Sequence, residues 1–448
     1  MKLKTNNFNN ANIKIIFLFF LLLVSFSRSP FLFLEGRFLA EEATTFFKYS
    51  YFNEWYKTLF FIDNIAGYNY VAANINAIIA DLVPLEKAPL ATIYGSLGIL
   101  FFIFYFILNT NSYLFINIFD RYLACLVLLL SPPFVAEVWL NSINTQVYLG
   151  ILTIIILFIN FEEKKFLNKC SPYILIFNGL SGIYSCVITP FFLLKYFLLR
   201  KKNDLINFFT LFFCCIFQGS IVVYSKLNNL VWPHSMSPFD INEVISFFYN
   251  AIFKAIFGRE IIIQIIDFFG TKNSIMIFIF FSILSIFSIY FIYKKKLIKF
   301  NFVFYFLLMI FITMGVFVMY GNDGVSTGGR YSVINGTVLI FILINLKNLL
   351  QSIKLKNFFS IILIFNLIVG AYEFFPKNDY DKKLIKCIEC PKWSNEIKRW
   401  NELENYKIKL WPYTKPNFED QKWMLDLNNP NLRTLEQYIN PEKLLNKL

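Results

Sequence analysis

The chain has 448 residues, of which 57% are hydrophobic and only 16% are charged, and its formal net charge is +13. A soluble domain of this length cannot bury so much apolar surface, so the composition excludes an ordinary cytosolic enzyme, a disordered chain and a fibrous repeat, and predicts an all-α polytopic membrane protein. The positive charge alone is compatible with nucleic-acid binding, but lysines in cytoplasmic loops explain it without a nucleic-acid partner.

The first predicted span covers residues 13–33. Its start resembles a signal peptide, but no clear small-residue cleavage site follows and the apolar run continues to Leu34, which favours an uncleaved helix. The next segment, 35–88, mixes acidic and aromatic residues. This pattern predicts an outer loop with one or two amphipathic helices.

Apolar runs of membrane-spanning length give about eleven spans in all. The stretch 172–199 is long for one crossing, and the small residues near its middle favour a hairpin of two short helices. With this hairpin, the main lysine and arginine clusters of the loops fall on the side of the N-terminus, which is then cytoplasmic. The further spans are predicted near 89–108, 119–136, 145–160, 172–182, 183–199, 204–224, 273–293, 301–320, 331–347 and 357–375.

These spans define a membrane domain, 1–375, and a small extracytoplasmic tail, 376–448. The outer loops 35–88 and 225–272 are predicted at the active-site face, and the part Val244–Phe257 is predicted as an amphipathic helix on the membrane surface. The tail carries several tryptophans, for which packing against the membrane domain is favoured over stacking on a sugar.

An acidic pair, Glu41 and Glu42, follows the first span. Adjacent carboxylates repel, which tends to raise one pKa toward the range of a general base. Arg37 precedes Glu41 by one helical turn and is the expected partner of its carboxylate. The alternative is a solvated interfacial face without chemistry.

Two further groups of polar residues lie at the outer ends of spans. Gly329, Arg330 and Tyr331 end a glycine-rich connection in which the arginine can bind a phosphate bidentately; the alternative is a flexible turn whose arginine reaches the lipid headgroups. The amides of Asn141, Asn144 and Gln146 can bond sugar hydroxyls, and the alternative is helix capping. The pair Pro132-Pro133 before them predicts a helix break.

Metal-binding patterns are weak in this sequence. Cys387 and Cys390 form a CxxC without a second cysteine pair or a nearby histidine, and His234 is the one histidine of the chain. Zinc sites need about four such ligands, so no metal site is predicted.

Several short motifs follow one another in a recognisable order. Ala40-Glu41-Glu42-Ala43 precedes Phe46, Gly67-Tyr68 and Pro84-Leu85-Glu86-Lys87-Ala88-Pro89 follow, and the segments 141–146, 180–190 and 328–331 come later. In this order they resemble the GT-C class of integral-membrane glycosyltransferases, most closely a poorly characterised bacterial branch. The likeness extends over most of the chain, although each element is short.

The resemblance implies an inverting transfer of a hexosyl or pentosyl group, from a polyprenyl-phosphate donor to an envelope glycan, lipid or protein on the outer face of the bacterial plasma membrane. Glu41 would be the base and Arg330 would hold the donor phosphate with Gly329 and Tyr331. Glu42 would position the acceptor or bind a divalent cation, and Arg37 and the three amides would contact acceptor or sugar.

The sequence also departs from the branch. Glu42 stands where Asp is expected, Ala43 replaces Gly, and Asn74 falls at a position that tends to be basic. An inactive member of the class is therefore one alternative. A transporter or flippase for a lipid-linked sugar and a non-catalytic protein of envelope assembly are others, although transporters usually carry ionisable residues near the bilayer midplane and the predicted spans hold almost none.

Overall fold

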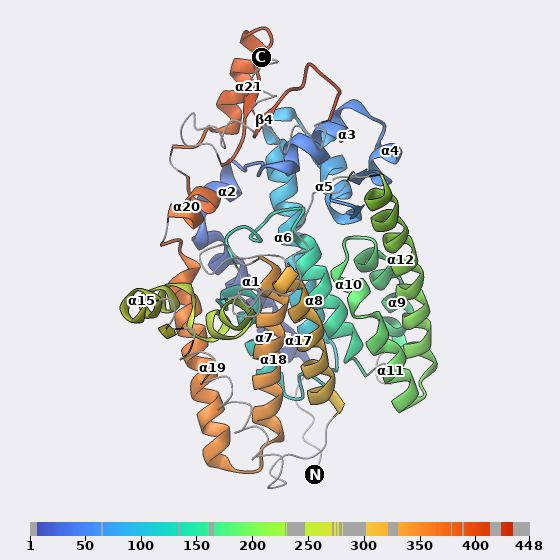
Figure 1. The fold of residues 1–448 in the computed structure, drawn as a ribbon, viewed down its shortest axis with the longest axis vertical. Helices are drawn as coiled ribbons and strands as arrows, with labels where there is room; N and C mark the ends of the chain where they lie inside the picture. Colours follow the sequence, from blue (N-terminus) through green and yellow to red (C-terminus); the bar gives the residue numbers. More distant parts are fainter. Residues whose placement is uncertain are drawn as a thin grey trace.

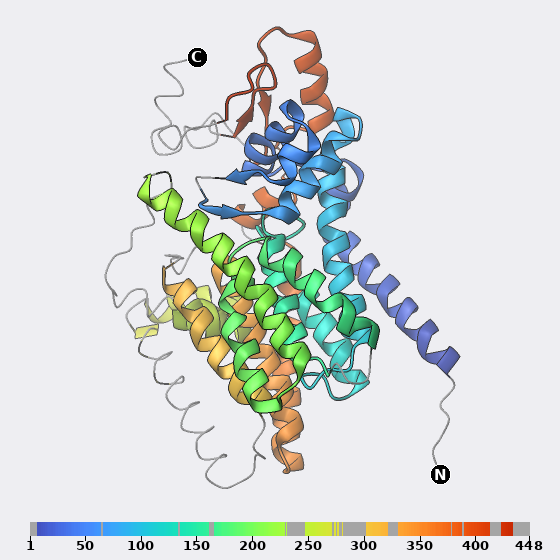
Figure 2. The same cartoon turned by 90° about the vertical axis from the view of Figure 1, so that its right-hand side faces the viewer.

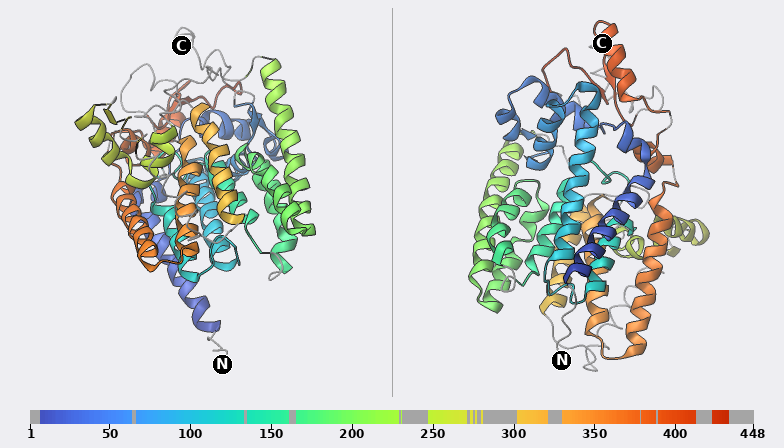
Figure 3. Two further views of the ribbon diagram at one scale, coloured as in Figure 1. Left: turned by 60° about the horizontal axis from the view of Figure 1, so that its bottom comes forward. Right: turned by 180° about the vertical axis from the view of Figure 1, so that it is seen from behind.

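The computed structural model describes residues 7–63, 66–132, 135–160, 165–228, 230, 247–270, 273–274, 276, 280, 302–320, 330–377, 379–387, 389–412 and 423–432, and in these it is nearly all helical. Five of the described helices are long and apolar enough to cross a membrane. They are α1 (Asn7–Arg28), α6 (Ala88–Asn109), α12 (Lys202–Leu227), α18 (Val333–Leu349) and α19 (Ile353–Phe374). Most run lengthwise through the molecule (Figure 1), and α1 leans away from the others at its N-terminal end (Figures 2 and 3).

Large apolar side chains cover the outer faces of α1, α12 and α19. Phe19, Phe213 and Ile368, for example, are each more than half exposed. Soluble proteins rarely leave such continuous apolar surfaces open to water. These helices therefore indicate a membrane protein.

Other helices fill the bundle between these five. At its centre every residue of α8 (Thr145–Leu157) is buried. The others are α7 (Ile118–Leu130), α9 (Lys165–Gly179), α10 (Tyr184–Val187), α11 (Thr189–Leu199) and α17 (Phe302–Tyr320).

Helices lie at most of the predicted spans; one further prediction is confirmed, and two spans differ from the prediction. The predicted hairpin is confirmed, because α9 ends at Gly179 and α10 begins at Tyr184. The predicted span 119–136 stops at Leu130, where the proline pair breaks the helix. The predicted span 13–33 divides at Ser29, whose hydroxyl donates to the carbonyl of Ile385, before the short helix α2 (Pro30–Leu34). Most of the predicted span 273–293 lies outside the described residues.

One end of the bundle carries a compact polar layer, called here the cap, formed by residues 35–87 and the described part of 376–432 (Figure 1). The first loop contributes η1 (Glu42–Phe47), α3 (Lys48–Phe52), α4 (Trp55–Leu59), α5 (Val71–Asp81), η2 (Leu85–Lys87) and the antiparallel hairpin of β1 (Ile62–Asp63) and β2 (Tyr68–Asn69). The C-terminal part adds α20 (Asp379–Ile385), α21 (Trp393–Glu402) and the antiparallel pair β3 (Ile408–Lys409) and β4 (Met424–Leu425).

The C-terminal part folds onto the first loop. Trp393 donates its indole N–H to the carbonyl of Leu85 at 2.7 Å, and the backbone N–H of Ala40 donates to the carbonyl of Trp411 at 2.9 Å. The predicted packing role of the tail tryptophans is therefore confirmed for these two. Cys387 and Cys390 form a disulfide in the same layer.

A close backbone approach fixes the entry into the cap. Gly36 has a φ of +71°, and a Cβ on it would lie 2.8 Å from the backbone nitrogen of Leu90. Only glycine tolerates both conditions. The turn after α2 is thereby held against the start of α6.

The predicted amphipathic helix Val244–Phe257 is wrong where the structure describes it. Its described part, η3 (Phe248–Phe253) and α14 (Lys254–Phe257), is packed inside the molecule, with Tyr249, Ala251 and Ala255 buried. The surface helix is instead α15 (Arg259–Phe269), which projects sideways from the bundle (Figure 1) and exposes Phe268. The remainder of the predicted helix lies outside the described residues.

Candidate functional site

Two tight turns meet at the base of the cap, and the first carries the acidic pair. The first leads into η1 and contains Ala40 with a φ of +49°, and the second lies between α7 and α8 and contains Leu140 with a φ of +47°. Each left-handed residue other than glycine costs about 1–2 kcal/mol. Such strain persists only where surrounding contacts enforce it, and it is common at functional sites.

The Glu42 carboxylate joins these two turns. It is 1% exposed, and its Oε2 accepts the backbone N–H of Leu39 at 2.9 Å. Its Oε1 accepts both the backbone N–H and the hydroxyl of Ser142, at 2.6 and 2.7 Å. Three hydrogen bonds therefore tie this buried carboxylate to both turns, away from solvent.

Arg37 completes this arrangement, and we call Arg37, Glu42 and Ser142 the clamp. The guanidinium of Arg37 lies 3.7 Å from Glu42, and both side chains are fully buried. Its Nε donates to the carbonyl of Leu384 at 2.8 Å and its Nη2 to that of Trp139 at 3.4 Å. The expected pairing of Arg37 with Glu41 is therefore wrong: Arg37 pairs with Glu42, and both side chains are buried, where they hold the two turns together. The acceptor contact of Arg37 and the catalytic role of Glu42 stay predictions.

The electrostatics of Glu42 reflect burial. Loss of solvent raises the pKa of its carboxyl, while the Arg37 guanidinium and the hydrogen bonds from Ser142 and Leu39 oppose the rise. Repulsion from Glu41, the cause expected from the sequence, is not among these effects. The two neighbouring acids therefore behave as separate groups.

Glu41 belongs to a different cluster, formed by Glu41, Tyr68, Glu137, Arg330 and Tyr331 and called here the Glu41 cluster. Glu41 is partly exposed and interacts electrostatically with Arg330. Arg330 opens η4 (Arg330–Ser332), the turn that leads into α18. The two residues to which the sequence gave the principal chemical roles thus act on each other electrostatically.

Arg330 is held by protein groups but stays accessible. Its Nη1 pairs with Glu137 Oε1 at 2.7 Å, and its Nη2 donates to the Tyr331 hydroxyl at 3.2 Å. Its side chain remains 42% exposed and that of Glu137 21%. A guanidinium has five N–H donors, so a phosphate can approach it without breaking every existing contact.

Aromatic hydroxyls form one wall of this cluster. Tyr68 and Tyr70 pack with ring centroids 4.4 Å apart, and Gln146 Nε2 donates to the Tyr68 hydroxyl at 3.4 Å. Burial raises the pKa of both phenols, so they stay protonated at neutral pH. Of the three predicted amides, Gln146 is thus the one that reaches the cluster.

The other two amides hold the loop. Asn141 Oδ1 accepts the backbone N–H groups of Ile143 and Asn144, at 2.9 and 3.4 Å, and Asn144 Nδ2 donates to the carbonyl of Glu137 at 3.0 Å. Both side chains are buried. Asn141 therefore stabilises the turn before α8 through its own side chain, and Asn144, the residue that precedes α8, makes no capping hydrogen bond with its side chain.

Asn74, which departs from the pattern of the resembling branch, is also structural. It is fully buried, and its Nδ2 donates to the carbonyls of Leu59 and Phe61 at 3.2 and 2.8 Å. It therefore ties α5 to the loop before β1. Gly329, predicted beside Arg330, lies outside the described residues, as does His234.

Sequence reasoning missed Glu137. A usable signal exists, because Glu137 is the one acidic residue between Asp120 and Glu162. An isolated acid in an otherwise neutral loop needs a charged partner or water. Its partner, however, comes from a distant segment and cannot be assigned from spacing.

Comparisons with known proteins found no relative of this chain. No protein-family model, no curated protein and no solved structure matches this chain. Among the described residues, no group of three or more histidine, cysteine or acidic side chains is arranged to hold a metal ion. The site therefore has to be judged by its own geometry: a partly exposed carboxylate at the start of η1 and a partly exposed guanidinium at the start of η4.

Proposed function

We propose that this chain is an integral-membrane glycosyltransferase that moves a sugar from a polyprenyl phosphate to an envelope acceptor on the outer face of a bacterial plasma membrane. The observation that carries the proposal is the accessible guanidinium of Arg330, 42% exposed and held by Glu137 and Tyr331, at a site where the partly exposed Glu41 also acts on it electrostatically. Transfer from a lipid phosphate to a hydroxyl requires a base and a phosphate-binding cation in one site.

In this mechanism the Glu41 carboxylate takes the proton of the acceptor hydroxyl as its oxygen attacks the anomeric carbon. The bond from that carbon to the phosphate oxygen breaks, with inversion, and the polyprenyl phosphate leaves as an anion. Arg330 stabilises the charge on the leaving phosphate, with Tyr331 beside it. In this proposal the hydroxyl of Tyr68, which accepts the amide N–H of Gln146, contacts the sugar.

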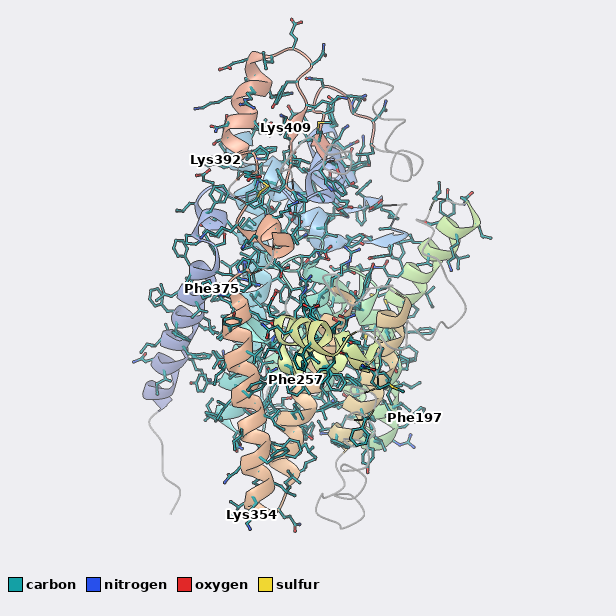
Figure 4. The ribbon with its side chains drawn as sticks, turned by 60° about the vertical axis from the view of Figure 1, so that its left-hand side comes forward. Phe197, Phe257, Lys354, Phe375, Lys392 and Lys409 are labelled. Atoms are coloured by element: carbon teal, nitrogen blue, oxygen red, sulfur yellow. A yellow bond between two sulfur atoms is a disulfide. The ribbon has the colours of Figure 1, made fainter. Side chains whose placement is uncertain are left out.

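Two features support an outer location of the cap. Disulfides persist in oxidising compartments, and the cap contains one between Cys387 and Cys390. Lys354, from one of the basic loop clusters, lies at the end of the bundle opposite the cap (Figure 4), which fits a cytoplasmic side. The N-terminus would then be cytoplasmic and the tail extracytoplasmic.

The rival transporter function draws less support. The described buried ion pairs within the bundle, Lys195–Asp204 at 2.8 Å and Lys347–Asp120 at 3.0 Å, belong to residues near helix ends. Proton or ion relays of transporters usually lie near the bilayer midplane.

The test is transfer by the purified protein with polyprenyl-phosphate sugars as donors. We expect Glu41→Gln to lower transfer about 10²–10⁴-fold, because the amide cannot accept the acceptor's proton. Glu54→Gln is the matched control, since Glu54 is an exposed acid of the same loop, and it should retain full transfer. Undiminished transfer by Glu41→Gln would sink the assignment, and flipping of the lipid without transfer would support the transporter.

A further inference from the structure

A second recess opens on the other side of the turn that carries Trp139. It has a cavity volume of about 40 Å³ and lies among the ends of α1, α7 and α19, α14, the start of α15 and α20. Its charged lining includes four cations, which are Arg28, Lys254, Arg259 and Lys377, and three acids, which are Glu260, Glu373 and Asp381. None of these residues belongs to the clamp or to the Glu41 cluster.

Arg28 is the unusual member of this lining. Its guanidinium carbon lies 4.6 Å from the ring centroid of Trp139 and 4.7 Å from that of Phe374, so two aromatic faces hold it. The residue is only 5% exposed, yet its buried Nε and Nη1 have no hydrogen-bond partner in the protein. Buried donors of a charged group without acceptors are costly, which points to an acceptor supplied by a ligand.

Protein groups already engage two of the nearby acids. Glu373 Oε1 accepts the backbone N–H of Glu260 at 2.8 Å, and Asp381 pairs with Arg259 at 3.4 Å. Asp381 also attracts Arg28, but without a hydrogen bond to its Nε or Nη1. The recess as a whole therefore has one more cation than acid and favours an anion.

The surroundings suggest the source of this anion. Phe268 on α15 is 82% exposed, and Tyr372 and Phe375 at the end of α19 are 59% and 45% exposed. Lys377 lies at the rim, with its Nζ 4.6 Å from the ring centroid of Tyr372. Apolar side chains and a lysine around an arginine at the ends of spanning helices match the chemistry of a lipid: acyl chains outside and a charged headgroup within.

We propose that this recess, the Arg28 pocket, binds the phosphate ester of a membrane lipid. The guanidinium N–H groups of Arg28, of which Nε and Nη1 have no acceptor in the protein, donate charge-assisted hydrogen bonds to the phosphate oxygens. Lys377 adds a longer-range attraction at the rim. The site is separate from the donor site of the proposed transfer, so its occupancy can be measured without any transferase assay.

The experiment compares three ligands on the purified full-length protein in detergent, with the melting temperature as readout. Phosphatidylglycerol should raise the melting temperature, because a ligand that binds only the folded state stabilises it. Diacylglycerol, with the same chains and no phosphate, should have no effect, and glycerol phosphate, without chains, should give a smaller rise. Equal shifts with phosphatidylglycerol and diacylglycerol would overturn the site. A full shift with glycerol phosphate alone would overturn the lipid as the source.

Variants assign the effect to the pocket. Arg28→Met should weaken apparent affinity for phosphatidylglycerol about tenfold or more, as expected for a lost charged hydrogen bond, and Lys377→Gln about fivefold. Lys354→Gln is the matched control, because Lys354 lies at the opposite end of α19 from Phe375 (Figure 4), and it should leave affinity unchanged. If Arg28→Met does not fold, the comparison of Lys377→Gln with Lys354→Gln tests the proposal. Equal affinity of Lys377→Gln and Lys354→Gln for phosphatidylglycerol would refute it, and so would unchanged affinity in a folded Arg28→Met.

Discussion

Glu41 and Glu42 are neighbours in the sequence but belong to two regions with opposite character. In the clamp, Glu42 is 1% exposed and accepts hydrogen bonds from Leu39 and Ser142. In the Glu41 cluster, Glu41 is partly exposed and faces an arginine whose side chain is 42% exposed. The Glu42 carboxylate therefore stabilises the fold, and the Glu41 carboxylate remains accessible to a reactant.

The two arginines repeat this contrast. Arg37 is buried and bridges the carbonyls of Leu384 and Trp139, which come from distant parts of the chain. Arg330 also has an acidic partner, but it keeps exposed surface. The comparison teaches that an ion pair alone does not distinguish a structural charge from one available for chemistry. A charge that is buried and also held by several protein hydrogen bonds is structural.

The largest stability effect is expected in the clamp. Glu42→Gln removes the charge that balances Arg37 at 0% side-chain exposure, and breaking a buried pair by removing one partner costs about 3–5 kcal/mol. Unfolding in mixed micelles, followed by tryptophan fluorescence, measures this loss. Glu41→Gln should change the free energy of unfolding by less than about 1 kcal/mol.

The same measurement on both variants can contradict this distinction between Glu41 and Glu42. If Glu41→Gln destabilised the protein as much as Glu42→Gln, the separation of a structural acid from an accessible one would fail. The clamp would then extend to both residues.

A smaller effect is expected for Ser142→Ala. This change removes the hydroxyl that donates to Glu42 at 2.7 Å but keeps the backbone donor. The lost hydrogen bond to a charged acceptor should cost about 1.5–3 kcal/mol. Ser27→Ala, whose exposed hydroxyl bonds only its own helix, should cost about 0.5 kcal/mol or less. Because Ser142 and Glu42 are in contact, the Ser142→Ala, Glu42→Gln double variant should lose less free energy of unfolding than the sum of the two single losses. Strict additivity would show that Ser142 does not belong to the clamp.

The sequence was sufficient for those features that depend on local composition. Apolar runs predicted the helices, because about 20 such residues are needed to cross a bilayer, and the small residues near 180 predicted the hairpin turn. Glu41 and Arg330 were predicted because both are charged residues just beyond apolar runs. These signals need no knowledge of which helices become neighbours.

The rest of the site depends on backbone conformation and distant contacts. Pairing Arg37 with Glu41 assumed a helix, in which residues four apart share a face. The structure instead has non-helical backbone before Glu41 and a left-handed Ala40, so the neighbouring acid meets the arginine. Glu137 and Ser142 act on residues of other segments, and no pattern within their own loop specifies those partners.

The smallest expected stability effect is the sharpest test of the accessible cluster. Glu137→Gln keeps an acceptor for Arg330 but removes the negative charge 2.7 Å away. Because the pair is partly exposed, the free energy of unfolding should change by less than about 1 kcal/mol. The charge of Arg330 would then act fully on the donor phosphate, so KM for the polyprenyl-phosphate sugar should fall, by about three- to tenfold for a gain of roughly 1 kcal/mol. A rise in KM would mean that Glu137 serves to orient Arg330 for the donor, and a loss of stability as large as that of Glu42→Gln would place Arg330 and Glu137 in the same structural class as the clamp.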